Sequence, residues 1–315
     1  MNDIKPINVL LKGIFLFIIF NLVIAAWQPG VGQFSLYNNI FPGRERLPFG
    51  ENPKQSYNLS LFNLDAMFAS HVIAGTPKAD DEFRVIIIGD SSVWGTLLKP
   101  EETLAGQLNE ASLNACGKNV HAYNLGYPTI SLTKDVMILS YGMQYNPDLI
   151  IWMTTLDAFP LEKQTSTPLV ANNEKKVREL AANYGLKVEA NDSNFEKKSF
   201  WKKTFIGDRR SWADIFRLQI YGVMWSATGI DQFYPADYEQ AQTDLEADES
   251  YHDLASPLNE DALALNALET GFRMAGETPM MLVNEPMLIS AGANSDIRYN
   301  FFYPRWAFDE YREMM

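Results

Sequence analysis

Apolar positions follow two patterns along the second part of the chain, and each predicts a type of element. Unbroken apolar runs of about four to eight residues that end in turns are typical of strands buried on both faces of a sheet. Such runs lie at 84–90, 119–126, 147–154 and 279–286. Apolar positions at helical spacing predict helices over 103–115, 131–145 and about 304–315.

This alternation of strands and helices predicts the fold class. Strands separated by helices of about 12 residues are joined by right-handed crossovers into a parallel sheet with helices on both faces. We therefore expect an α/β fold with a doubly wound, flavodoxin-like parallel sheet. The third and fourth strands are about 120 residues apart, far more than the usual connection of about 2–6 residues, so we expect a helical insertion over about 160–278.

An apolar run near the N-terminus determines the expected location. Residues 9–27 contain two polar residues, and about 19 residues at a rise of 1.5 Å approach the ~30 Å thickness of a bilayer core. Lys5 and Lys12 precede or open the run, and Trp27 closes it. The positive-inside rule then places the N-terminus in the cytoplasm and the main part of the chain outside, behind a single-pass signal anchor.

A cleaved signal peptide is the alternative for this run. It is disfavoured because Ile24, which is not small, stands at the third position before a cut after Ala26. The predicted organisation is a cytoplasmic tip with a membrane helix over 1–28, a membrane-proximal connector rich in Gly and Pro with one short ordered element over 29–82, and an α/β domain over 83–315.

Composition and charge exclude several classes of protein. With 47% apolar residues the chain is not intrinsically disordered. It has 26 Lys and Arg against 39 Asp and Glu, a net charge of −13, and no basic stripe that suits a nucleic-acid partner. The single Cys116 forms no internal disulfide. No histidine pair, cysteine cluster or glycine-rich phosphate loop predicts a metal or cofactor.

Charge is segregated within the predicted insertion. Residues 162–217 hold twelve Lys or Arg, whereas residues 218–272 hold none of these and eleven Asp or Glu. We interpret the two segments as solvated helical faces, with a glycan- or cation-binding lid as the alternative. The aromatic residues of this region either pack the helices together or stack on sugar rings. They are Trp201, Trp212, Tyr221, Trp225, Phe233 and Tyr234.

Candidate chemistry follows the first predicted strand. Ligands bind at the carboxyl ends of the strands of a doubly wound sheet, so Ser91 is placed as a nucleophile would be. Gly89 permits a sharp turn, Asp90 orients it, and the start of the next helix offers free N–H groups to an oxyanion. An ordinary turn with a capping serine is the alternative. A phosphatase that uses Asp90 is disfavoured, because Ser92 stands where it would need a second aspartate.

These residues resemble those of a known family, the SGNH hydrolases or GDSL esterases and lipases, particularly the membrane-anchored branch that acts on the cell envelope. The first family block is matched by Gly89, Asp90, Ser91 and Gly95, and the second by Asn124, Leu125 and Gly126. The resemblance implies that Ser91 attacks an ester and that its N–H and groups near Gly126 hold the oxyanion. It also implies a late Asp-x-x-His that supplies the base and its orienting group.

The sequence departs from this family at three places. Thr129 replaces a usual glycine of the second block, and Leu156 replaces an asparagine that donates to the oxyanion. No Asp-x-x-His follows the fourth predicted strand, and we expect the chain to end before the strand and block that would carry it. We interpret His71, His121 and His252 as structural or surface residues, with His252, beside acidic residues, as the candidate surrogate base.

The expected function is that of an envelope esterase or O-acyltransferase. Its substrates would be acyl esters, above all acetyl esters, of polysaccharide or small molecules, with Ser91 as the acyl carrier and the membrane bound through residues 9–27. Because Leu156 cannot donate, we expect a second oxyanion donor from the backbone between Gly126 and Thr129. The alternative is a catalytically silent surface protein that binds glycans or partners.

Overall fold

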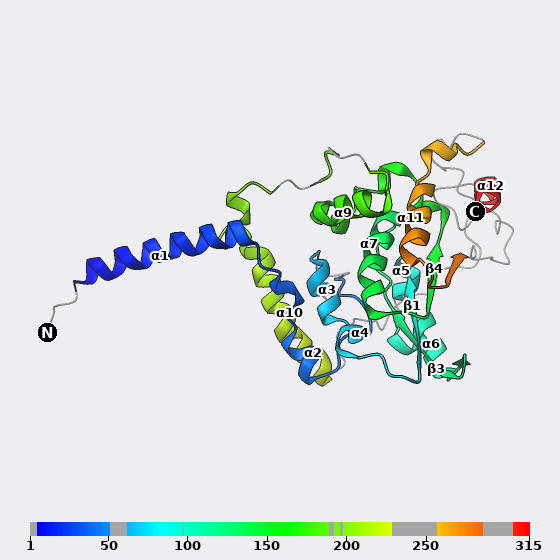
Figure 1. Cartoon of the computed structure of the whole chain (residues 1–315), viewed down its shortest axis with the longest axis horizontal. Coiled ribbons are helices and arrows are strands. Elements are labelled where there is room, and N and C mark those ends of the chain that lie inside the picture. Colours follow the sequence, from blue (N-terminus) through cyan, green and yellow to red (C-terminus); the bar gives the residue numbers. More distant parts are fainter. Residues whose placement is uncertain are drawn as a thin grey trace, which may run out of the picture.

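The computed structural model describes residues 5–50, 62–96, 98–188, 192–195, 198–228, 257–285 and 305–315. Figure 1 shows one long N-terminal helix that projects away from a globular part, in which helices surround a sheet. The fold class is α/β, as the alternation of strands and helices predicted.

Over the described residues the sheet has five strands, in the order β2-β3-β1-β4-β5. Its strands are β1 (Glu82–Ile88), β2 (Asn114–Ala115), β3 (Lys118–Asn124), β4 (Leu149–Thr154) and β5 (Met280–Asn284). The four predicted strands are confirmed, and β3, β1, β4 and β5 are parallel. The short β2 pairs antiparallel with β3, so the sheet is mixed, and it occupies the end of the stretch 103–115 that was wrongly predicted to be all helix.

The side chains of the central strand β1 alternate between two apolar clusters. Ile86 and Ile88 join a large cluster with residues of α7 (Leu132–Gly142) and α11 (Leu265–Ala275). Val85 and Ile87 point to the other face and pack with Ala105 of α6 (Leu104–Glu110). Each face of the strand is therefore covered by helix, which explains why its sequence is an unbroken apolar run.

Among its described residues, the predicted insertion contains three α-helices before α11, the helix that precedes β5. They are α8 (Pro168–Asn172), α9 (Glu174–Tyr184) and α10 (Arg209–Thr228). The first two pack with α7 over the sheet, whereas α10 packs against α2 (Leu36–Ile40) and α3 (Leu64–Ser70). The helix expected near the end of the chain is α12 (Arg305–Met314).

The described parts of 29–82, expected to form a connector, pack into the main core. They contain α2, α3 and α4 (Val72–Gly75), and Tyr37, Phe68 and Ile73 are buried in the same cluster as the sheet. Apolar positions at helical spacing, rather than the Gly and Pro residues around them, therefore determine the structure of this segment.

The N-terminal helix α1 (Pro6–Trp27) has 22 residues and contains an 18-residue window with a mean hydropathy of 2.5, which makes it long and apolar enough to cross a membrane. At 1.5 Å per residue it spans about 33 Å. Most of its apolar side chains are exposed, and its last third contacts the globular part.

Candidate active site

The predicted nucleophile lies at the carboxyl edge of the sheet. Ser91 is the first residue of the short helix α5 (Ser91–Trp94), which follows β1 after a two-residue turn. The Asp90 carboxylate caps this helix by accepting from the Ser92 N–H at 2.9 Å. A side chain at Gly89 would place its Cβ 2.6 Å from Val93, so glycine lets α5 fold back onto the end of the strand.

Asn124, which ends β3, and Gly126 after it hold α5 in place. The Asn124 amide donates to the Val93 carbonyl at 2.7 Å and accepts from the Gly126 N–H at 3.0 Å. A Cβ at Gly126 would lie 2.4 Å from the Trp94 nitrogen, so a larger residue would displace α5. Asn124 and Gly126 therefore position the turn that carries Ser91.

The backbone N–H groups after β3 are already hydrogen-bonded. The Gly126 N–H donates to Asn124, the Tyr127 N–H to the Gly89 carbonyl at 3.0 Å, and the Thr129 N–H to the Tyr127 carbonyl at 2.6 Å. In this conformation the turn offers no free oxyanion donor. Within the part of the chain that the structure describes, the Ser91 N–H has no acceptor.

A buried ion pair lies directly behind this turn, and sequence reasoning did not single it out. The Lys134 ammonium is fully buried and donates to Asp135 at 2.5 Å, to the Gly89 carbonyl at 2.7 Å and to the Tyr127 carbonyl at 3.2 Å. Burial raises the pKa of the Asp135 carboxyl, although Lys134 opposes the shift. Lys134 thus joins the first turn of the site to the second.

Glu285 is the functional candidate that sequence reasoning missed. It follows β5, its N–H donates to the Thr154 carbonyl at 2.8 Å, and its carboxylate accepts a hydrogen bond from the Ser92 hydroxyl. Burial is the largest cause that raises the pKa of Glu285 to about 7, and the negative charge of Asp90 adds to it. Its position directly after the fourth predicted strand, which is β5, could have marked it as a site residue, because ligands bind at the carboxyl ends of such strands.

The histidines that the structure describes make no hydrogen bond to Ser91, Ser92 or Glu285. His71 is fully buried between α3 and α4, where its Nε2 lies 3.0 Å from the Asn124 carbonyl. Burial lowers its pKa to about 4. His121 is exposed in β3 against the Tyr123 ring, directly before the three buried residues that end the strand. The candidate surrogate base His252 falls outside the described residues.

The end of β4 differs from the family pattern as the sequence indicated. Leu156 is fully buried and has no polar group to offer, and Asp157 pairs with Lys163. Tyr311 of α12 contacts Thr154 through the two hydroxyl oxygens, which are 3.2 Å apart. Among the described residues, no group of three His, Cys, Asp or Glu is arranged to hold a metal ion.

These residues can support nucleophilic acyl transfer. A serine with a free N–H begins a helix, and a carboxyl group that titrates near neutrality contacts the adjacent hydroxyl. Comparisons of this chain with protein-family models, with curated proteins and with solved structures find no match. A function for this chain is therefore inferred from its sequence motifs and from the geometry of this site.

Proposed function

We propose that the chain is a membrane-anchored, extracytoplasmic SGNH-type esterase or O-acyltransferase that acts on acyl esters, above all acetyl esters, of envelope polysaccharide. One observation carries the proposal. The Glu285 carboxyl, whose pKa is raised to about 7, accepts from Ser92 directly beside Ser91. A base poised near the working pH beside a hydroxyl at a helix start suits acyl transfer.

In this proposal Ser91 attacks the acyl carbonyl carbon. Its hydroxyl proton passes to the Ser92 oxygen while Ser92 gives its own proton to the Glu285 carboxylate, and protonated Glu285 then returns a proton to the departing alkoxide. The Ser91 N–H stabilises the oxyanion. Water completes hydrolysis by attacking the acyl-Ser91 ester, and a sugar hydroxyl in its place gives acyl transfer.

A catalytically silent protein that binds glycans or partners is the second candidate. It is supported by the buried Leu156 and by the hydrogen bonds that already occupy the N–H groups of Gly126, Tyr127 and Thr129. One oxyanion donor fewer costs roughly 2.7–4 kcal/mol of barrier. The described histidines, His71 and His121, also supply no base to the carboxyl edge.

The fold and the location complete the proposal. The strand order β3-β1-β4-β5 agrees with a doubly wound, flavodoxin-like sheet, and helices cover both faces of β1. We place α1 across the membrane with the N-terminus in the cytoplasm. Cys116, which is exposed, is the natural probe: a membrane-impermeant maleimide should label it in intact cells or spheroplasts. Labelling that occurs only after lysis would show that the main part of the chain faces the cytoplasm, opposite to this proposal.

Hydrolysis of an aryl acetate and of acetylated polysaccharide tests the activity. Ser91→Ala should lower turnover by about 1000-fold or more, and Glu285→Gln by roughly 100-fold or more. Ser92→Ala is the matched neighbour and should lower turnover less than Ser91→Ala. Turnover that Ser91→Ala leaves intact, or its absence in the unaltered chain on every ester tried, would favour the silent protein.

A further inference from the structure

The helix α10 is apolar on its exposed face as well as on its packed face. Leu218 and Trp225 are buried against the globular part, whereas Phe216 and Ile220 are 62% and 63% exposed. The exposed apolar residues recur at helical spacing along one stripe: Phe216, Ile220, Val223 and Met224. A continuous apolar stripe of this kind on a surface helix indicates an interaction surface rather than a solvated one.

The neighbouring segment extends this stripe into a patch. The Gln219 side chain accepts from the Leu36 N–H at 2.8 Å and donates to the Phe34 carbonyl at 3.2 Å, so this segment lies along α10. Phe34, Leu36 and Ile40 are all more than half exposed. We call these three residues and the α10 stripe the apolar patch.

The residues that lead into α10 lie against the last third of α1. Phe20 and Phe205 are in edge-to-face contact with ring centroids 5.5 Å apart, and the Asn21 side chain accepts from the Ile206 N–H at 3.1 Å. Asn21 is six residues before the end of α1, which corresponds to a depth of about 9 Å. We call residues 200–206 the tip. The tip therefore lies beside the last turns of α1, closer to the N-terminus of α1 than the point at which that helix ends.

Several backbone N–H groups at the end of this segment and just after it are hydrogen-bonded, which an apolar environment favours. The Gly207 N–H donates to the Thr204 hydroxyl at 3.0 Å, and the Asp208 N–H to the Thr204 carbonyl at 2.9 Å. The Ile206 N–H is satisfied by Asn21 of α1. At the same tip, Trp201 is 72% exposed. An exposed tryptophan on a closed backbone is typical of a membrane interface.

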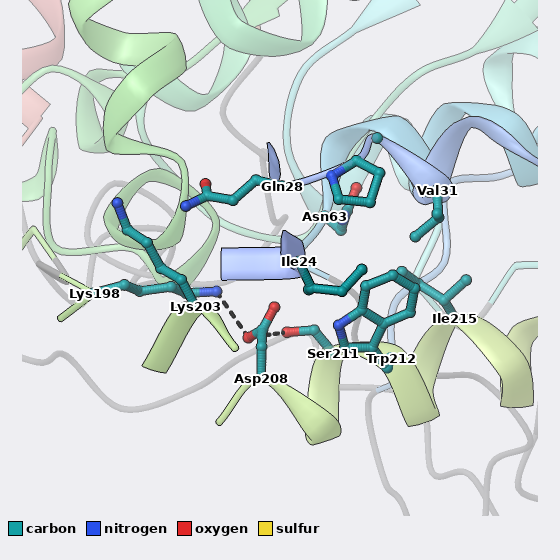
Figure 2. A pocket seen from close by; sticks show the side chains of 13 residues that line it. Ile24, Gln28, Val31, Asn63, Lys198, Lys203, Asp208, Ser211, Trp212 and Ile215 are labelled. Atoms are coloured by element: carbon teal, nitrogen blue, oxygen red, sulfur yellow. Dashed lines mark hydrogen bonds and ion pairs between the residues drawn. The ribbon is translucent and has the colours of Figure 1, made fainter. Parts of the chain in front are cut away.

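Cationic side chains surround the place where α1 meets α10. A pocket of about 120 Å³ lies there, lined by Ile24 and Trp212 and bordered by Lys198, Lys203 and Asp208 (Figure 2). The Lys198 ammonium pairs with Asp208 at 3.0 Å, and Arg209 and Arg210 are exposed next to it. In a chain of net charge −13, this cluster puts positive charge where anionic lipid headgroups would lie.

From these contacts we infer that the tip over 200–206 and the apolar patch bind the lipid bilayer that α1 crosses, with the cations around the pocket at the headgroup level. Figure 1 shows α10 beginning beside the end of α1, running away from it at a steep angle and lying on the side of the globular part nearest α1. A helix in that position lies along the membrane surface, where an apolar face enters the bilayer by about 5–10 Å. The inference rests on the proposed membrane span of α1.

Quenching by lipids tests the inference on the full chain in vesicles of phosphatidylcholine and phosphatidylglycerol. Three variants, Trp201→Cys, Ile220→Cys and Phe15→Cys, are made in a Cys116→Ser background, and each receives one NBD label. The unaltered chain, labelled with NBD at Cys116, is the distant control. Lipids with a doxyl group near the headgroup should quench labels at 201 and 220 and shift their emission to the blue. The label at Cys116, on the hairpin of β2 and β3, should be neither quenched nor shifted.

The outcomes separate this inference from the membrane span itself. Lipids with a doxyl group deep in the acyl chain should quench the label at 15. If they do, and if the labels at 201 and 220 are not quenched by any doxyl lipid, α1 spans the membrane but the inference is overturned. Labels at 201 and 220 that are shielded from iodide but not quenched by doxyl lipid would assign the surface to a protein partner or a second copy. Loss of quenching at 15 as well would refute the span and the inference together.

Discussion

Replacing the buried Lys134 removes the cation that joins the two turns of the site. Its ammonium is fully buried and contacts the Asp135 carboxylate, the Gly89 carbonyl and the Tyr127 carbonyl. Lys134→Met keeps much of the side-chain volume while it removes the charge and all three hydrogen bonds. The Asp135 carboxyl then keeps one polar partner among the described residues, the Trp152 indole N–H at 3.2 Å.

The magnitude follows from the burial of both partners. Removing one member of a buried ion pair leaves an uncompensated charge and costs about 3–5 kcal/mol of unfolding free energy. Adding Asp135→Asn to Lys134→Met removes that charge, so the double variant should recover most of the loss. Lys175, whose side chain is 94% exposed, offers the matched control: Lys175→Met should change the unfolding free energy by less than about 0.5 kcal/mol.

Urea unfolding of the full chain in detergent micelles, followed by tryptophan fluorescence, measures these differences. We expect a large loss of unfolding free energy for Lys134→Met, recovery of most of that loss in the double variant, and no measurable change for Lys175→Met. A loss below about 1 kcal/mol for Lys134→Met, or a double variant less stable than the single one, would refute the role given to this ion pair.

Three further predictions concern the pH dependence and the geometry of the site. Because the pKa of His71 is lowered to about 4 in the folded state, its contribution to the unfolding free energy is complete above about pH 6.5 and is lost as pH falls through 4, a loss of about 3 kcal/mol. The urea midpoint of the unaltered chain should therefore fall over this pH range, and the midpoint of His71→Gln should not show that fall. Gly126→Ala places a methyl group 2.4 Å from the Trp94 nitrogen, so it should displace α5 and lower ester turnover by about 100-fold while the circular dichroism spectrum is kept. Asp90→Asn removes a negative charge that raises the pKa of Glu285, so the rise of kcat/KM with pH should move from near 7 to lower pH, and an unmoved profile would argue against Glu285 as the base.

Local sequence patterns predicted the sheet because each strand buries both faces. The apolar runs at 84–90 and 147–154 coincide with β1 and β4, and helical spacing located α7 and α12. The short β2 carries no such pattern, because two residues beside a turn at Cys116 and Gly117 form it. Its pairing depends on the left-handed backbone of that turn, which a hydrophobicity pattern does not report.

The candidate site was only partly predictable from one sequence. The Ser91 turn and Gly126 stand in recognisable motifs, and the structure brings both to one edge of the sheet. Lys134 and Asp135 read as surface residues of an amphipathic helix, and nothing local indicates that they are buried as a pair. Glu285 acquires its raised pKa from burial and from Asp90, which is almost 200 residues away in the sequence.

The tryptophans in and near α10 also could not be assigned roles from the sequence alone. The sequence spacing of Trp201, Trp212 and Trp225 does not distinguish which of them packs between helices and which is exposed for stacking. In the structure Trp225 is buried in the core, Trp212 lines the pocket at α1, and Trp201 is exposed. Phe233 and Tyr234, the other candidates for sugar stacking, lie outside the described residues. The three tryptophans differ because of where α1 and α2 lie, and that depends on contacts far apart in the chain.

Covalent labelling of the full chain with a fluorophosphonate, followed by peptide mass spectrometry, tests the central claim most directly. A serine activated for acyl transfer reacts with this probe, whereas an ordinary surface serine does not. The account predicts one adduct on Ser91, reduced in Glu285→Gln and faster as pH rises through about 7, as the pKa of Glu285 requires. An adduct on Ser92 would exchange the roles of the two serines, and no adduct at either residue would contradict the assignment of this edge as an acyl-transfer site.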